Sequence, residues 1–349
     1  MTRVGRNKRG RTLTAALLAG VMMLVLAACG SDDDTSTPEP SNGDGITYPQ
    51  QNLRLAMIVS RDEPLGRAMQ YFIREVEERS GGAITIDFFP DGQLGGDTDV
   101  IEQAADGTVN IFATGFTPGT ELGILFSPWL FTSYEQVDAV LQSEVGTQFD
   151  DALRRDFGVT MLDAFKRAPR HITSNGRPIE NPADLAGFRM RVPEIPVMLD
   201  VFAAFDTDAV AMAFAEVYTA LETGTISGQE NPFPTIFGFS LQEVQEYLNL
   251  TFHAHVPEFI FVSVEWWEGL DDASRTLMEE VLAEAKLVAA EETDRAEAEL
   301  LETLSENMIV VESDVAAFQE LARATHDRII PPIIGEESYA ILRAIVDGS

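Results

Sequence analysis

The chain has 349 residues, of which 24 are Lys or Arg and 57 are Asp or Glu, and its formal net charge at pH 7 is −33. This excess of negative charge argues against nucleic acids and anionic membrane surfaces as binding partners, because both repel an acidic protein. The chain contains one cysteine, Cys29, so no disulfide can form within it and the fold must be stabilised by burial of apolar side chains.

The N-terminal segment has the layout of a secretory signal. Basic residues precede an apolar run at 13–26 that is short for a membrane-spanning helix, and the run ends in Leu26-Ala27-Ala28-Cys29. This tetrapeptide resembles a lipobox, in which the cysteine becomes the lipidated first residue of the mature protein. We therefore expect a lipoprotein-type signal peptide at 1–28, a lipid on Cys29 that anchors the protein to the membrane, and an extracytoplasmic location. The alternative is an uncleaved anchor with an incidental cysteine.

A polar segment follows the signal. Residues 30–50 are rich in Gly, Ser, Asp, Thr and Pro and contain few apolar side chains. Such a segment cannot bury enough surface to offset its conformational entropy, so we predict a flexible tether at 29–50.

The remaining part of the chain, about 300 residues, is too long for one small domain and fits two α/β lobes. Strands and helices alternate at its start, which predicts a parallel sheet with helices on both faces. The elements expected first are strands at 53–59, 83–89 and 109–113, helices at 65–79 and from Asp97 or Thr98 to 107, a buried connection at 122–131, helices at 134–141 and 147–157, and a strand at 159–165.

The second lobe is expected to begin near residue 169. Asn181 and Pro182 suit the N-cap and first position of a short helix that Gly187 ends. Later elements are a strand through Arg191, helices at 196–205 and 214–222, a strand at 248–255 that crosses back to the first lobe, a strand at 308–311, and helices at 315–327 and 336–346.

One long helical pattern at 271–307 contains no internal Gly or Pro. At about 1.5 Å per residue it is longer than one lobe, so we expect a helix that spans both lobes; a coiled-coil dimer is the competing interpretation. The expected lobe boundaries are 51–168 plus about 257–296 for lobe I, and 169–256 plus about 297–349 for lobe II.

Arg191 stands at the end of an alternating segment, GFRMRVP. Period-two alternation places Met190 and Val192 on one face of a strand and Arg191 on the other, and Pro193 cannot continue a central strand. Arg191 should therefore lie at a strand end, where open α/β sheets bind ligands.

The basic residues are unevenly distributed. No Lys or Arg occurs between Arg79 and Arg154 or between Arg191 and Arg275. An acidic protein that captures an anion needs local cations, and a guanidinium is the best fork for a carboxylate. Of the basic residues between these gaps, Arg170 and Arg191 are the candidates for anion binding. Arg154, Arg155, Lys166 and Arg167 are interpreted as solvated surface charges paired with nearby acids.

Three sequence blocks carry a family resemblance: PADLAGFRMRVP at 182–193, AMAFAEVYTAL at 211–221 and GQENP at 228–232. In this order they resemble the solute receptors of tripartite ATP-independent periplasmic (TRAP) transporters of the DctP type. The resemblance implies a periplasmic-binding-protein-like fold of two α/β lobes with a ligand cleft. It also implies an organic acid as the ligand, TRAP permease membrane subunits as partners and no cofactor.

The same resemblance implies roles for individual residues. Arg191 corresponds to the arginine that binds the ligand carboxylate through two bonds, and Asn231 to the asparagine that donates to the same carboxylate. Phe214 corresponds to the aromatic residue that packs on the ligand, and Arg170 to an arginine that makes a second contact. Glu194 occupies a position that varies with the substrate and could accept bonds from ligand hydroxyls or an amine.

The sequence departs from the family pattern at 205–211, Ser227 and Pro169. The identity of the acid therefore stays open among C4-dicarboxylates, sugar acids, 2-oxo acids and aromatic acids. Weaker ligand-binding candidates in the first lobe are Arg61, Glu63, Asp97 and Trp129.

An enzyme is disfavoured, because the chain has no thiol beyond Cys29, no HExxH, no Gly-rich phosphate loop and no G-x-S-x-G motif. His253 and His255 could bind a metal, but packing within a strand is the preferred interpretation, so no metal site is predicted. Two further functions are compatible with the sequence: a carboxylate-binding lipoprotein that serves a sensor or another permease, and a purely structural lipoprotein.

Overall fold

The computed structural model describes residues 46–115 and 121–348, which belong to one compact unit, 39–349. The predicted signal peptide, Cys29 and residues 29–45 of the predicted tether lie outside the described residues. None of the helices in the described ranges combines the length and the apolar character that a membrane crossing requires.

The first of two sheets has five strands in the order β2-β1-β3-β10-β4. β1, β2 and β3 are parallel, as the alternation of strands and helices predicts, whereas β10 pairs antiparallel with both β3 and β4. The strands are β1 Gln51–Met57, β2 Ile84–Phe89, β3 Ile111–Thr114, β4 Val159–Phe165 and β10 Glu258–Ser263, and the helices before and after them are α1 Pro64–Arg79, α2 Asp97–Ala105, α3 Tyr134–Leu141, α4 Glu144–Phe157 and α8 Val264–Glu268.

Helices cover both faces of this sheet. Alternate side chains of β1, such as Leu55 and Met57, join a core that includes Met69 of α1, while Ala56 joins a second core with Ile101 of α2. Both faces are therefore buried toward the end of β1, which explains why its last three residues, Leu55, Ala56 and Met57, are all apolar.

The second sheet has six strands in the order β11-β9-β5-β8-β6-β7. Its strands are β5 Arg170–Ser174, β6 Arg189–Val192, β7 Asp208–Ala211, β8 Gly228–Asn231, β9 Tyr247–Ala254 and β11 Ile309–Glu312. The elements that accompany it are η2 Pro182–Leu185, α5 Pro196–Ala203, η3 Phe214–Glu216, α6 Val217–Glu222, α7 Phe233–Gly238, η4 Leu241–Glu243, α10 Val315–Ile329, α11 Pro331–Ile334 and α12 Glu336–Asp347. β6 pairs in parallel with β7 on one side and β8 on the other, so Arg191 lies on an interior strand.

The predicted strand at 248–255 has the right place in the sequence but a different course. β9 lies wholly in the second sheet, where it pairs with β5 and β11, and the chain crosses between sheets only after it, at residues 255–257. β10 then enters the first sheet. The sequence prediction merged the strand with the crossing because no residue marks the end of β9, and the first clear break, Pro257, comes at the end of the crossing.

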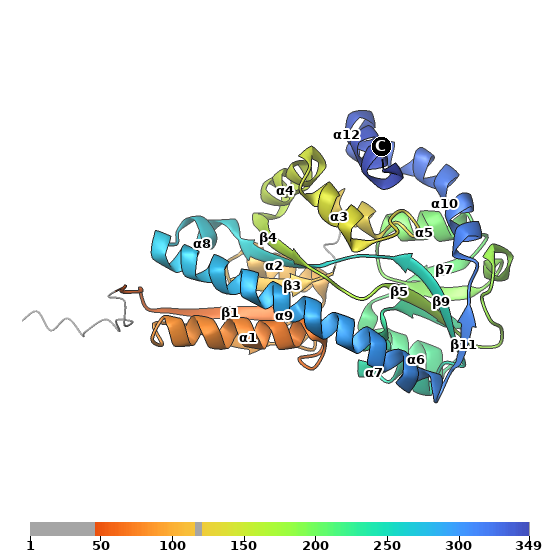
Figure 1. Cartoon of the computed structure of the whole chain (residues 1–349), viewed down its shortest axis with the longest axis horizontal. Coiled ribbons are helices and arrows are strands. Elements are labelled where there is room, and N and C mark those ends of the chain that lie inside the picture. The colour runs from red at the N-terminus through yellow and green to blue at the C-terminus, as the bar shows by residue number, and fades with distance from the viewer. Residues whose placement is uncertain (1–45, 116–120, 349) are drawn as a thin grey trace, which may run out of the picture. The chain divides into compact units, whose positions relative to one another are not determined.

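The long helix α9 is Asp272–Ser305. Leu277 and Ala289 pack in the core beside α1, whereas Leu304 joins a separate core with Phe233 of α7. Figure 1 shows α9 passing from α1 to α7. The prediction of one helix that spans both lobes is confirmed, and the chain has the predicted two-lobed α/β fold.

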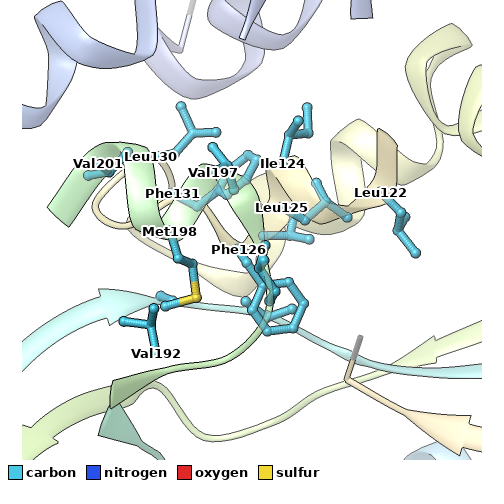
Figure 2. Close-up of a cluster of buried hydrophobic side chains, with 14 of the residues drawn as sticks. Leu122, Ile124, Leu125, Phe126, Leu130, Phe131, Val192, Val197, Met198 and Val201 are labelled. Carbon is cyan, nitrogen blue, oxygen red and sulfur yellow. The ribbon is translucent and has the colours of Figure 1, made fainter. Parts of the chain in front are cut away.

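The buried connection expected at 122–131 begins with η1, Glu121–Phe126, and its apolar side chains are buried. They pack against α5, and Figure 2 shows Met198 of α5 pointing toward Val192 at the end of β6. This apolar cluster fixes the strand end that carries Arg191, because side chains in a dense core have little freedom to move.

Candidate ligand-binding site

Two adjoining cavities lie between the sheets. The inner cavity, about 80 Å³, is lined from the first sheet's side by residues that include Asp97 and Thr114 and from the second by Arg170, Arg191 and Asn231. The outer cavity, about 430 Å³, shares Arg191, Asp97 and Phe214 with it. Together they form a cleft in the size range of small-molecule sites.

Arg191 reaches the cleft from β6 and is 4% exposed. Its Nε donates to the carbonyl oxygen of Met212 at 2.8 Å, and its guanidinium carbon lies 5.7 Å from the centre of the Phe214 ring. Among the described residues it forms no ion pair, and burial lowers the pKa of Arg191 to about 10. The guanidinium stays charged at neutral pH and its two terminal nitrogens donate to no described residue, so they can bind an anion.

Arg170 lies on β5 and is also 4% exposed, but its charge is neutralised within the protein. Its Nε and Nη2 donate to the two carboxylate oxygens of Glu230 at 2.5 and 2.8 Å. Burial raises the pKa of Glu230, but the Arg170 guanidinium outweighs this and the pKa falls to about 2. The antiparallel pairing of β5 with β8 brings these two residues together from 60 positions apart in the sequence.

Asn231 follows Glu230 on β8 and is held by two hydrogen bonds. Its Oδ1 accepts from Arg170 Nη2 at 2.9 Å, and its Nδ2 donates to Gln229 Oε1 at 2.7 Å. A side-chain amide carries two N–H groups, so one remains to donate into the cleft. Behind this group, Nε2 of the buried His253 lies 2.9 Å from Glu230 Oε2. Within the described residues no group of acidic, histidine or cysteine side chains is arranged to hold a metal ion.

Phe214 and Glu194 occupy the outer part of the cleft. Phe214 begins η3, is half-buried and packs edge-on against Phe239 with ring centres 4.7 Å apart. Glu194 is exposed just beyond the end of β6 and lines the outer cavity with Arg191. The structure therefore gathers all five predicted ligand-binding residues around one cleft: Arg170, Arg191, Glu194, Phe214 and Asn231.

Arg167 differs from the expectation of a solvated charge. Its side chain is 13% exposed, pairs with the buried Glu258 at 2.7 Å and donates to Thr235 Oγ1 at 3.0 Å. Its neighbour Lys166, by contrast, pairs with Asp294 on the surface of α9. Nothing in the sequence separates these adjacent basic residues, because the crossing between the sheets decides which of them points inward.

The weaker first-lobe candidates divide between cleft, surface and core. Asp97, one of the two residues at which the helix was expected to start, is the first residue of α2 after the cap residue Gly96. Its carboxylate accepts from the Thr114 hydroxyl in the cleft. Glu63 lies near Arg167 and accepts from Thr235 Oγ1 at 3.1 Å. Of the others, Arg61 is exposed and Trp129 stacks in the core on Phe318.

Comparisons with known proteins agree with this architecture. The family model of bacterial extracellular solute-binding protein, family 7 (DctP), matches residues 55–331. Solute-binding protein RD1_1052 of Roseobacter denitrificans is 33% identical over 287 residues, which cover 78% of this chain and 85% of that protein. The C4-dicarboxylate-binding periplasmic protein DctP of Rhodobacter capsulatus is 29% identical over 302 residues, which cover 84% and 90% of the two chains.

Solved structures give the same result. The crystal structure of RD1_1052, a TRAP periplasmic solute-binding protein with bound L-galactonate, matches with a TM-score of 0.77 and 30% identity over 86% of this chain and 99% of that chain. A TRAP periplasmic solute-binding protein of Sulfurospirillum deleyianum with bound succinate matches with a TM-score of 0.78 and 25% identity, over 85% and 99%. The chain therefore belongs to the bacterial extracellular solute-binding proteins of family 7, the DctP family, whose members are receptors rather than enzymes.

Proposed function

We propose that this protein is an extracytoplasmic receptor that binds an organic acid by its carboxylate and delivers the acid to the membrane subunits of a TRAP transporter. The observation that carries the proposal is the buried guanidinium of Arg191, which lines the cleft and forms no ion pair with a described residue. A ligand carboxylate would supply the missing anion. The organic acids bound by the related receptors support this chemistry.

In this proposal the carboxylate accepts two bonds from Arg191 and one from the remaining N–H of Asn231. Arg170 contributes through Nη1, since its Nε and Nη2 donate within the protein. Phe214 packs on the apolar part of the ligand, and Glu194 accepts from polar groups at its outer end. Charge-assisted bonds of this kind are worth about 1.5–3 kcal/mol each.

Binding is proposed to draw the lobes together about the three places where the chain passes between them: 166–169, 255–257 and the helix α9. Lobe I would comprise 51–168 and about 257–296, and lobe II 169–256 and about 297–349. Closure of this kind excludes water and so strengthens the bond between the carboxylate and Arg191.

The lipid anchor is the second part of the proposal. A lipid on Cys29 and a tether over 29–50 would hold the receptor at the membrane while leaving the compact unit free to reach the permease. Replacing Cys29 with Ser should move the protein from the membrane fraction to the soluble fraction. Because an uncleaved signal segment can also hold the variant in the membrane, incorporation of labelled fatty acid is measured as well, and its absence from the wild type would contradict lipidation.

A thermal-shift screen against organic acids tests the binding proposal. A ligand at about 100 times its dissociation constant stabilises a protein by about 2.7 kcal/mol, which corresponds to several degrees. We expect at least one acid to shift the wild type but not Arg191→Ala. Native mass spectrometry checks first for a co-purified acid, which would mask the shift. Equal shifts in both proteins would refute the assignment of Arg191.

A further inference from the structure

The arginines that line the cleft differ in whether they have a carboxylate partner. Three arginines reach it: Arg167, Arg170 and Arg191. Arg167 is paired with Glu258 and Arg170 with Glu230, which leaves Arg191 as the one lining cation of the described residues that has no carboxylate partner. The cleft is therefore equipped to neutralise a single ligand carboxylate.

The wall across from Arg191 carries negative charge. Asp91, Asp97 and Asp99 line the outer cavity from the first sheet's side. The one described cation that lines either cavity from that side is Arg167, and its charge is paired with Glu258. Of these acids, Asp97 alone also lines the inner cavity. A second ligand carboxylate would therefore meet the Asp97 carboxylate there, with no unpaired cation of the described residues to neutralise it.

Asp97 is held in place but is not saturated with hydrogen bonds. The Thr114 hydroxyl donates to its Oδ1, while Oδ2 accepts no side-chain hydrogen bond from a described residue. Burial raises the pKa of the Asp97 carboxyl, and the charges of Arg191 and Arg167 act in the opposite direction. Arg191 and Asp97 thus interact across the cleft without forming an ion pair, so a small ligand can lie between them.

We infer that Asp97 determines the specificity of the receptor by accepting a hydrogen bond from a ligand hydroxyl, so that the ligand class is the hydroxyl-bearing monocarboxylates. The inference rests on the proposed function, because it takes the ligand carboxylate to lie on Arg191. A dicarboxylate would bring its second anion against Asp97, and like charges in a partly desolvated site repel strongly. An ammonium group can also donate to a carboxylate, so amino acids of the same chain length are included in the test.

Two matched series of acids test the inference with the whole protein, solubilised in detergent. Each series holds chain length constant and changes one group: D-erythronate, succinate, butyrate and 4-aminobutyrate have four carbons, and D-galactonate, adipate, hexanoate and 6-aminohexanoate have six. Titration calorimetry should show that, in the series that fits the cleft, the hydroxy acid binds at least about tenfold more tightly than its three counterparts.

The variant Asp97→Asn removes the charge but keeps an oxygen that can accept from Thr114. Its affinity for the hydroxy acid should fall by about tenfold or more. The ratio of its affinities for the hydroxy acid and for the dicarboxylate of equal length should also be smaller than in the wild type. Asp200→Asn is the matched control, because Asp200 is exposed on α5 away from both cavities. Asp97→Ser removes the same charge and serves if Asp97→Asn fails to fold.

Each outcome decides the question. The inference is overturned if the wild type prefers succinate, a plain acid or an amino acid, or if removal of the Asp97 charge leaves hydroxy-acid affinity and discrimination unchanged. In those cases loss of binding by Arg191→Ala would still uphold the proposed function. If no acid of either series binds and Arg191→Ala changes nothing, both the inference and the proposed function fail.

Discussion

Arg170 and Arg191 lie on strands of the same sheet, line the same cleft and are equally buried, yet they differ in what neutralises them. Arg170 has an internal anion, because β8 supplies Glu230 at 2.5 Å. Arg191 has no such partner among the described residues and contacts a backbone carbonyl and an aromatic ring. The second sheet therefore supplies a carboxylate that neutralises Arg170 and supplies none for Arg191.

This difference distinguishes Arg170, whose charge is neutralised inside the fold, from Arg191, whose charge is proposed to bind a ligand. A charge buried without a partner is unfavourable, and an arginine whose pKa is lowered to about 10 cannot escape by losing its proton at neutral pH. In the proposed function, Arg191 takes its neutralising anion from solution. Four variants test this contrast.

The largest expected effect is that of Glu230→Gln. The substitution leaves Arg170 and His253 in place but removes the internal anion, so Arg170 becomes a buried unpaired charge as well. We expect the free energy of unfolding to fall by about 3–5 kcal/mol, measured by urea denaturation. Glu194→Gln, at an exposed position, is the control and should stay within about 0.5 kcal/mol of the wild type. A stability equal to that of the control would show that the Arg170 pair is not structural.

Glu63 is a third buried ionisable group, and unlike the two arginines it can lose its charge near neutral pH, by binding a proton. It is 6% exposed and its Oε1 has no hydrogen-bond partner in the described part of the chain. Burial raises the pKa of Glu63 from 4.5 to about 7, although the Arg167 charge opposes the rise. The folded protein therefore holds this proton more tightly than the unfolded chain does. The stability it contributes is fully present below pH 4.5 and is lost as the pH rises through about 7.

The variant Glu63→Gln should remove this dependence. From about pH 4 to about pH 8, the free energy of unfolding of the wild type should fall by about 3 kcal/mol more than that of the variant. The comparison cancels every group that titrates equally in both proteins. A difference between the two proteins that does not change with pH would show that Glu63 has an ordinary pKa.

The smallest effect is expected at Arg189, two residues before Arg191 on β6. Its side chain is 49% exposed and pairs with Asp208 at 2.7 Å on the outside of the sheet. Arg189→Gln should change the free energy of unfolding by less than about 1 kcal/mol and leave ligand affinity unchanged. Calorimetry with the acid found in the screen measures both arginines under the same conditions. A large loss of affinity in Arg189→Gln would mean that net charge, rather than the position of Arg191, attracts the ligand.

The features that depend on local sequence pattern were predicted from the sequence. Alternation in GFRMRVP predicts Arg191 on a strand, opposite Met190 and Val192, and the structure has it there. The difference in burial between Arg191 and Arg189, which share a face in that pattern, was not predicted. Asn181 caps η2 as predicted, accepting from the Ala183 amide at 3.2 Å. The family blocks located the residues of the cleft. The long helix followed from an uninterrupted pattern and needed no tertiary information.

The sequence did not predict the partners of the charges. Glu230 lies in GQEN, a buried strand with no apolar side chain to mark it, so neither β8 nor its pairing with Arg170 could be expected from periodicity. The ion pair of Arg167 with Glu258 forms because the crossings at 166–169 and 255–257 lie side by side. Local propensity carries no information on contacts of this range.

The most direct test of the central claim is Arg191→Met, measured without and with ligand. Methionine keeps much of the side-chain volume and removes a charge that has no partner in the described protein. We expect the unliganded variant to unfold at the same or a higher urea concentration than the wild type, and its affinity for the acid to fall by about 2–5 kcal/mol. A large loss of stability without ligand, or retention of wild-type affinity, would contradict the claim that a bound carboxylate neutralises Arg191.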